Sequence, residues 1–121
     1  MFTAYNNNMK KITLLQLLLL LAIDLIGLYM KVTFQYQYKL LHEGLGIVVG
    51  VVSLGTVYLA FKQKLTSKVK VMAVLALGFI GVASIGGHLI EIFPVDWFTY
   101  GLMEGGGVLS LLTTLWMLKF I

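Results

Sequence analysis

Four long apolar runs, separated by short polar or aromatic segments, set the pattern of this chain. The runs cover approximately residues 12–30, 40–61, 71–93 and 101–120. Each has about 20 residues, which is the length that an α-helix needs to cross the hydrocarbon core of a bilayer. The pattern therefore predicts an all-α integral membrane four-helix bundle that forms a single domain over residues 1–121.

Small or polar residues recur at helical spacing within each run. In the first run they form one stripe, which should face the other helices because lipid offers such groups no hydrogen-bond partner. The stripe consists of Thr13, Gln16, Asp24 and Gly27; similar faces are His42, Gly46, Gly50 and Ser53 in the second run, and Gly81, Ser84, His88 and Glu91 in the third. In the fourth run, we expect Ser110, Thr113 and Thr114 to form hydrogen bonds between helices.

The composition is that of a membrane protein. Hydrophobic residues make up 60% of the chain and charged residues 12%, whereas soluble domains carry about 25% charged residues. The absence of cysteine excludes disulfides, thiolate metal sites and cysteine nucleophiles. The net charge is +4, but the lysines lie at the ends of the runs and form no single basic face. We therefore exclude nucleic-acid binding and expect the chain's partner to be the lipid bilayer.

The lysines are distributed unequally between the two sides of the membrane. Four spans place the N-terminus, residues 62–70 and the C-terminus on one side, which holds seven of the nine lysines. The positive-inside rule then predicts a multi-pass protein of the cell membrane with both termini in the cytoplasm. The five acidic residues and both histidines fall in or near the outer half of the membrane.

His42 and His88 have nearly the same predicted depth. Counted from the inner lysines, the two positions agree to within about 3 Å at helical rise. Neighbouring antiparallel helices could face the two imidazoles toward each other, with nearby glycines leaving room for a flat macrocycle. This is what a b-type haem needs, with Met103 or Met30 as a substitute for one ligand. The opposing interpretation is that each histidine is a hydrogen-bonded or interfacial helix-end residue.

A metal ion is a second use of these residues. His42, His88 and Glu91 could supply nitrogen and oxygen ligands, together with Asp24 or Glu43. This site requires three helices to cooperate, so we rank it below the haem hypothesis.

Proton or ion transport is a third use of the polar residues. Asp24 lies about two turns inside the outer end of the first run, where a lone carboxyl could bind a proton or a cation. Glu43 and Glu104 are further candidate carboxyls near the outer side. No spacing of serine, histidine and acid indicates hydrolysis, and whether the chain is an enzyme stays open.

An internal duplication is a further hypothesis. Residues 41–46 align with residues 102–107 at an offset of 61, with four identical positions out of six. Each half would then be a helical hairpin, the two hairpins would be related by an axis along the membrane normal, and Met103 would take the place of His42. Against this hypothesis, chance matches are frequent in so apolar a sequence, and the first and third runs match poorly.

The sequence Glu-Gly-Leu-Gly at residues 43–46 and the stretch from Ala83 to His88 resemble DoxX-like small membrane proteins. These are four-helix proteins of similar length, often with an acidic residue and paired glycines at the start of the second helix. The chain departs from them in lacking an arginine early in the first helix. The resemblance implies a four-helix bundle, in some cases attached to respiratory or sulfur-oxidising complexes, and it implies no established active site.

These features together predict a small membrane redox or respiratory accessory protein. It would bind haem b or a quinone at an outer-side polar cluster centred on His42 and His88, with Asp24, Glu91 and Glu104 nearby. The alternatives are a transporter or channel for ions or small solutes, and a ligand-free assembly partner of a membrane complex. Association with other membrane subunits, or with further copies of the chain, is compatible with each of them.

Overall fold

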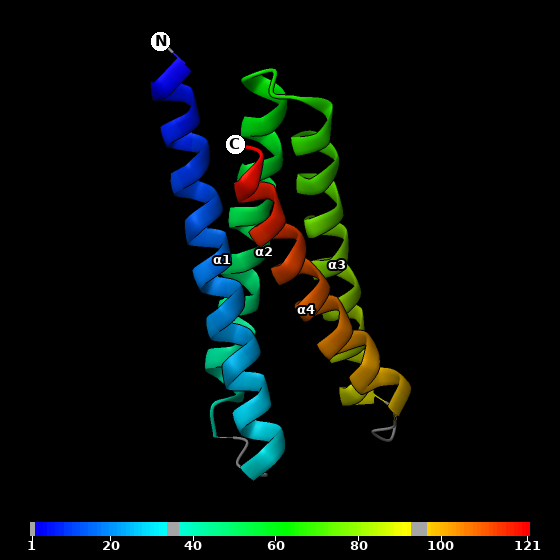
Figure 1. Cartoon of the computed structure of the whole chain (residues 1–121). Helices are drawn as coiled ribbons and strands as arrows, with labels where there is room; N and C mark the ends of the chain where they lie inside the picture. The colour runs from blue at the N-terminus through cyan, green and yellow to red at the C-terminus, as the bar shows by residue number, and fades with distance from the viewer. Residues whose placement is uncertain (1, 34–36, 93–96) are drawn as a thin grey trace.

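Four α-helices account for nearly all of the described chain, as the apolar runs predicted (Figure 1). The computed structural model describes residues 2–33, 37–92 and 97–121. The helices are α1 (Phe2–Thr33), α2 (Lys39–Lys62), α3 (Ser67–Ile92) and α4 (Trp97–Lys119), and the described residues form no strand. The prediction of an all-α four-helix bundle is confirmed.

All four helices begin earlier than the apolar runs, α2 by a single residue and the other three by four or more. α1 starts at Phe2, ten residues before the predicted run, and carries Met9 into a fully buried position. α3 and α4 each begin four residues earlier than expected, at Ser67 and Trp97. The apolar pattern marks the part of a helix that lies in hydrocarbon, whereas the helix itself can continue into the polar interface. The pattern therefore underestimated the length of these helices.

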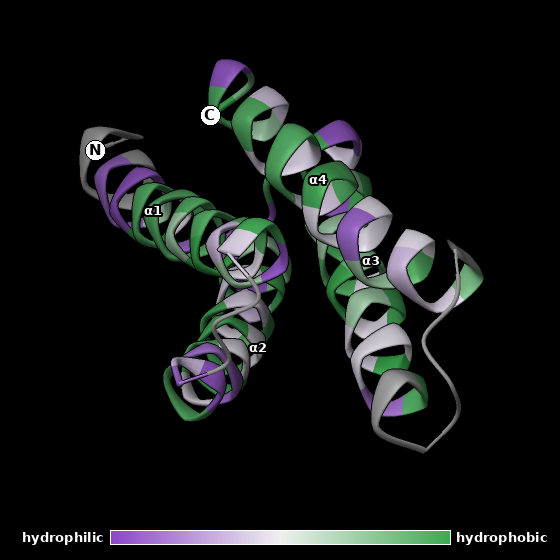
Figure 2. Cartoon of the chain, turned by 90° about the horizontal axis from the view of Figure 1, so that it is seen from below, coloured by the Kyte–Doolittle hydropathy of each residue, from purple (hydrophilic) through white to green (hydrophobic). Residues whose placement is uncertain are grey.

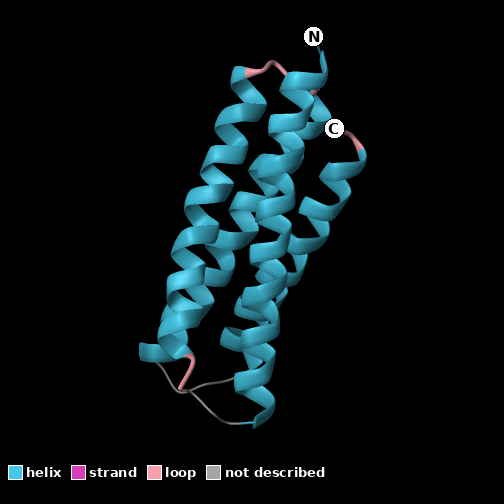
Figure 3. Ribbon diagram, turned by 90° about the vertical axis from the view of Figure 1, so that its left-hand side faces the viewer, coloured by secondary structure: helices cyan, strands magenta, loops and turns pink. Residues whose placement is uncertain are grey.

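The helices form an antiparallel ring in which each helix packs against two neighbours. α1 and α3 both contact α2 and α4, whereas within the described ranges neither α1 and α3 nor α2 and α4 contact each other. The N-terminus, the α2–α3 turn and the C-terminus lie at one end of the bundle (Figures 1 and 3). We call it the lysine end, because it holds Lys10, Lys11, Lys62, Lys64, Lys68, Lys70 and Lys119. At the opposite end, called the far end, the α1–α2 and α3–α4 hairpins lie apart (Figures 1 and 2).

An apolar surface surrounds this bundle. Large hydrophobic side chains point outward along all four helices, among them Leu18, Ile47, Val51, Val71 and Leu112. All four helices are long and apolar enough to cross a bilayer. So extensive an apolar surface is stable against lipid and not against water. The chain is therefore a small multi-pass integral membrane protein.

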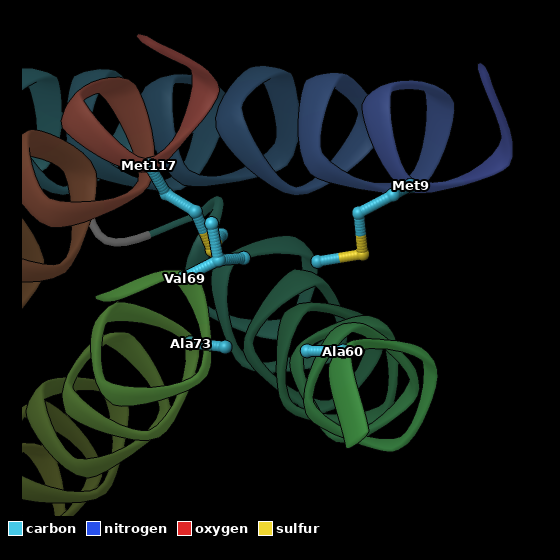
Figure 4. Packing of buried hydrophobic residues seen from close by; sticks show 5 residues of the cluster. All are labelled: Met9, Ala60, Val69, Ala73 and Met117. Atoms are coloured by element: carbon cyan, nitrogen blue, oxygen red, sulfur yellow. The ribbon is translucent and has the colours of Figure 1, made fainter. Parts of the chain in front are cut away.

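Small and flexible apolar side chains fill the bundle at the lysine end. Met9, Ala60, Val69, Ala73 and Met117 are at most 1% exposed and pack together (Figure 4). They come from all four helices, so this cluster joins the two hairpins. The alanines let the helix backbones approach, and the methionines fill the irregular space that remains.

A layer of buried polar side chains crosses the middle of the bundle. Gln16 of α1 is bonded to α2 and to α4. Its Nε2 donates to Thr114 Oγ1 (2.9 Å), and its Oε1 accepts from Thr56 Oγ1 (2.7 Å). All three side chains are fully buried. Hydrogen bonds of this kind contribute about 0.6–1.7 kcal/mol each between membrane helices, so Gln16 stabilises α1 against two neighbours at once.

The same layer continues into α3. Thr114 Oγ1 donates to the carbonyl oxygen of Ser110 (2.8 Å), and Ser110 Oγ donates to the carbonyl oxygen of Ala76 in α3 (2.9 Å). One series of hydrogen bonds thus connects all four helices, and we call Gln16, Thr56, Thr114 and Ser110 the polar layer. The interhelical roles predicted for Ser110 and Thr114 are confirmed. The prediction for Thr113 is wrong, because its hydroxyl donates to a carbonyl of its own helix, that of Leu109.

The backbones of α3 and α4 pack close together at two glycines. A Cβ added at Gly86 would lie 2.6 Å from the backbone nitrogen of Met103, and one at Gly106 would lie 2.7 Å from the backbone nitrogen of Ala83. Neither backbone can retreat without separating the helices. Glycine at both positions is therefore required for this contact, as at other close crossings of membrane helices.

Replacing Gly86 by alanine is expected to destabilise the protein by about 1–3 kcal/mol, because the added methyl group has no space against α4. Gly81→Ala is the matched control in the same helix, since a Cβ there meets no atom of the described residues within 4 Å. Free energies of unfolding measured in bicelles would check this difference. Equal losses from the two substitutions would contradict the close packing of α3 and α4.

Candidate functional site

Asp24 lies inside the membrane-spanning part of α1 and faces α4. A Cβ added at Gly107 of α4 would collide with Asp24 Oδ1. Asp24 Oδ2 is buried and has no hydrogen-bond partner in the part of the chain that the structure describes. Thr13 and Gln16 on the same helix are fully buried, so the stripe predicted on α1 does face the other helices. Asp24 is thus a carboxyl group at membrane depth with one unpaired oxygen.

The other two candidate carboxyls form ion pairs at the far end. Glu104 Oε1 lies 2.8 Å from Lys31 Nζ, which joins α4 to α1, and Glu43 Oε1 lies 3.9 Å from Lys39 Nζ one turn away on α2. The four side chains are about half exposed. Lys31 Nζ also lies 5.1 Å from the centre of the Tyr100 ring. Among the three carboxyls predicted to bind a proton or an ion, Asp24 therefore differs from the others in lacking a lysine partner within the described residues.

The two histidines have different surroundings. His42 is partly buried and lies against α1, with its Nε2 3.1 Å from the position that a Cβ would take on Gly27. Glycine at position 27 thus makes room for the imidazole between α1 and α2. His88 is exposed on α3, and so are Gly81 and Ser84. The small and polar face predicted on the third run therefore points away from the interior of the bundle.

Two of the three predicted metal ligands, His42 on α2 and His88 on α3, have described side chains. Residues with described side chains include no group of three histidine, aspartate or glutamate residues that could hold a metal ion. The side chain of Glu91, the third predicted ligand, lies outside those described. The metal set of His42, His88 and Glu91 stays a prediction.

Met103 of α4 packs against α3, much as His42 of α2 packs against α1. Its sulfur lies 3.9 Å from the position of a Cβ on Gly87, and its backbone nitrogen packs on Gly86. At the offset of 61, Gly27, the residue that His42 contacts, aligns with position 88, next to Gly87. His42 and Met103, which align at this offset, thus pack against nearly aligned positions of α1 and α3. The duplication itself stays a prediction.

Three contacts made by polar side chains of α1 follow one another along its boundary with α4. They are Gln16 with Thr114, Asp24 with Gly107, and Lys31 with Glu104, and we call them the polar seam. Along α1, the three levels are about 12 Å and 10 Å apart at helical rise. The seam therefore reaches from the polar layer in the middle of the bundle to the half-exposed ion pair at the far end.

The residue that the sequence analysis did not recognise is Gly107, which it considered only as part of the possible duplication. The count of residues from the inner lysines, which compared the depths of the two histidines, also places Gly107 level with Asp24. Asp24 follows Lys10 by 14 residues, and Gly107 precedes Lys119 by 12, so the two depths agree to within about 3 Å. Such a count does not show which faces of α1 and α4 meet, because that depends on how Gln16 packs.

Comparison with family models, with curated proteins and with solved structures found no match to this chain. The resemblance to DoxX-like proteins therefore rests on residues 43–46 and 83–88 alone and stays a prediction.

Proposed function

We propose that this protein is a small ion or solute transporter in which the Asp24 carboxyl takes up and releases a proton or a cation. The observation that carries the proposal is the buried, unpartnered Oδ2 of Asp24 at membrane depth. Ionisable residues inside membrane spans are costly and typically belong to proton relays and ion pathways. A carboxylate in this position is stabilised when it binds a proton or a cation, so uptake and release are the natural chemistry of the site.

The polar seam supports a path toward this carboxyl from the far end. The half-exposed Lys31–Glu104 pair stands at the end of the seam, and Asp24 lies about two turns farther inside on α1. The absence of a side chain at Gly107 lets the carboxyl pack directly against the backbone of α4. Toward the lysine end, the hydrogen-bonded Gln16 and Thr114 supply further polar groups at the same helix contact.

Replacing Asp24 by asparagine is expected to reduce transport to the level of protein-free vesicles, because the amide keeps the shape of the side chain but cannot exchange a proton or neutralise a cation. The measurement is proton and monovalent-cation flux into proteoliposomes that contain the full chain. Glu43→Gln is the matched control, because that carboxyl is exposed and paired with Lys39. Wild-type flux no greater than that of empty vesicles, or unchanged flux in Asp24→Asn, would overturn the proposal.

A quinone or haem b site is the second candidate function. An open groove of about 280 Å³ on the α1–α2 hairpin favours the quinone, and this groove is lined by Leu25, Ile26, Tyr29, Tyr38 and Leu41. Two tyrosine rings 5.8 Å apart in such an apolar groove suit a flat, lipid-soluble ring compound. For haem b, the axial ligands would be His42 and His88, with Met103 as the alternative. The resemblance to DoxX-like proteins agrees with a role beside a respiratory complex.

The visible spectrum of the purified protein tests the haem hypothesis directly. After reconstitution with haem, the oxidised and dithionite-reduced protein should show a Soret band that His42→Ala removes. Met30→Leu is a volume-conserving change at a methionine that the sequence also offers as a substitute haem ligand, and it is expected to leave the band unchanged if the two histidines are the ligands. A protein that shows no Soret band after reconstitution would exclude this candidate.

We also propose that the protein lies in the cell membrane with the lysine end in the cytoplasm, since lysine-rich ends of membrane proteins face inward. The chain contains no cysteine, so single cysteines can be introduced at the exposed residues Gln37 and Ser67, at opposite ends of the bundle. A membrane-impermeant maleimide added to intact cells should label Gln37→Cys and not Ser67→Cys. The reverse labelling pattern would invert the proposed orientation.

A further inference from the structure

We propose that the lysine end carries a binding site for the headgroup of an anionic phospholipid, between the α2–α3 turn and the end of α4. The site is separate from Asp24 and from the polar seam. It consists of a small cavity and of two lysines beside it, Lys68 and Lys119.

The cavity has a volume of about 220 Å³ and lies where the α2–α3 turn meets the end of α4. It is lined by Leu65, Thr66, Val69, Phe120 and Ile121. The hydroxyl of Thr66 adds a polar group to a lining that is otherwise apolar in its side chains. A cavity of this kind fits a ligand with a polar head next to a hydrocarbon chain.

Two ammonium groups converge on the ring of Phe120, which lines this cavity. Lys68 Nζ lies 4.5 Å and Lys119 Nζ lies 6.0 Å from the centre of that ring. Neither lysine forms an ion pair with any residue of the described ranges, where both ion pairs are at the far end. Two like charges near one ring repel each other, and an anion beside both of them would offset that repulsion.

The level of this site in the membrane favours a lipid as the source of the anion. The apolar runs begin at about residue 71 on α3 and end at about residue 120 on α4, so the two lysines lie near the boundary of the hydrocarbon core. Lipid phosphates lie at this level, and lysines there attract anionic lipids. The partly exposed apolar side chains of Leu65 and Ile121 would contact the beginning of the acyl chains, a contact that a free phosphate ion cannot make.

Native mass spectrometry of the full chain, with phosphatidylglycerol or phosphatidylcholine added in detergent, tests this proposal. We expect wild-type protein to retain phosphatidylglycerol in preference to phosphatidylcholine. The double substitution Lys68→Gln, Lys119→Gln should weaken phosphatidylglycerol binding about 30-fold, which corresponds to the loss of two membrane-proximal lysines. The matched control is Lys10→Gln, Lys11→Gln, which removes the same charge from α1 at the same end and should leave binding nearly unchanged.

Three results would overturn the proposal: no preference for phosphatidylglycerol in the wild type, equal losses in the two double variants, or displacement of the lipid by inorganic phosphate at equal concentration. The second result would indicate attraction by net charge, and the third a site for a free phosphate. Asp24→Asn should keep the lipid preference, so the outcome is independent of the transport proposal.

Discussion

The buried side chain of Gln16 is the constraint on which the arrangement of the helices depends. An amide inside a membrane has no water to bond with, and its donor and acceptor must both find partners in the protein. Gln16 finds them on two helices, Thr56 of α2 and Thr114 of α4. These two bonds fix both the rotation of α1 about its axis and its height relative to its neighbours. Through Ser110, the same polar layer reaches α3.

The position of Asp24 follows from that rotation. Asp24 is eight residues beyond Gln16, about 80° past two full turns, so it lies on the same half of α1 as Gln16, and that half faces the other helices. There it meets Gly107, and one turn earlier on α4 Glu104 pairs with Lys31. The polar seam is thus a consequence of one hydrogen-bonded side chain and of helical geometry. It leaves the remaining surfaces of the helices free to be apolar and to face lipid.

The helices and the inward face of α1 could be predicted from the sequence, because lipid excludes both non-helical spans and polar side chains that point outward. A glutamine or an aspartate in a span is too costly to expose, so its direction is determined. The same logic fails for Gly81 and Ser84 of α3, which are exposed, because glycine has no polar side chain and serine can bond to its own helix. His88 is also exposed, close to the end of the span, where water is near. The depth of a residue in the membrane could be counted along the chain. The rotation of each helix about its axis could not, because it depends on the contacts between helices.

The most direct test of the role of Gln16 is a double-mutant cycle with Gln16→Leu and Thr114→Val, using free energies of unfolding measured in a bilayer environment. Both substitutions keep the approximate volume and remove the hydrogen-bonding groups, so the cycle isolates the bond between the two side chains. The expected coupling is about 0.6–1.7 kcal/mol. Losses that add to within about 0.3 kcal/mol would contradict the conclusion that this bond holds α1 against α4.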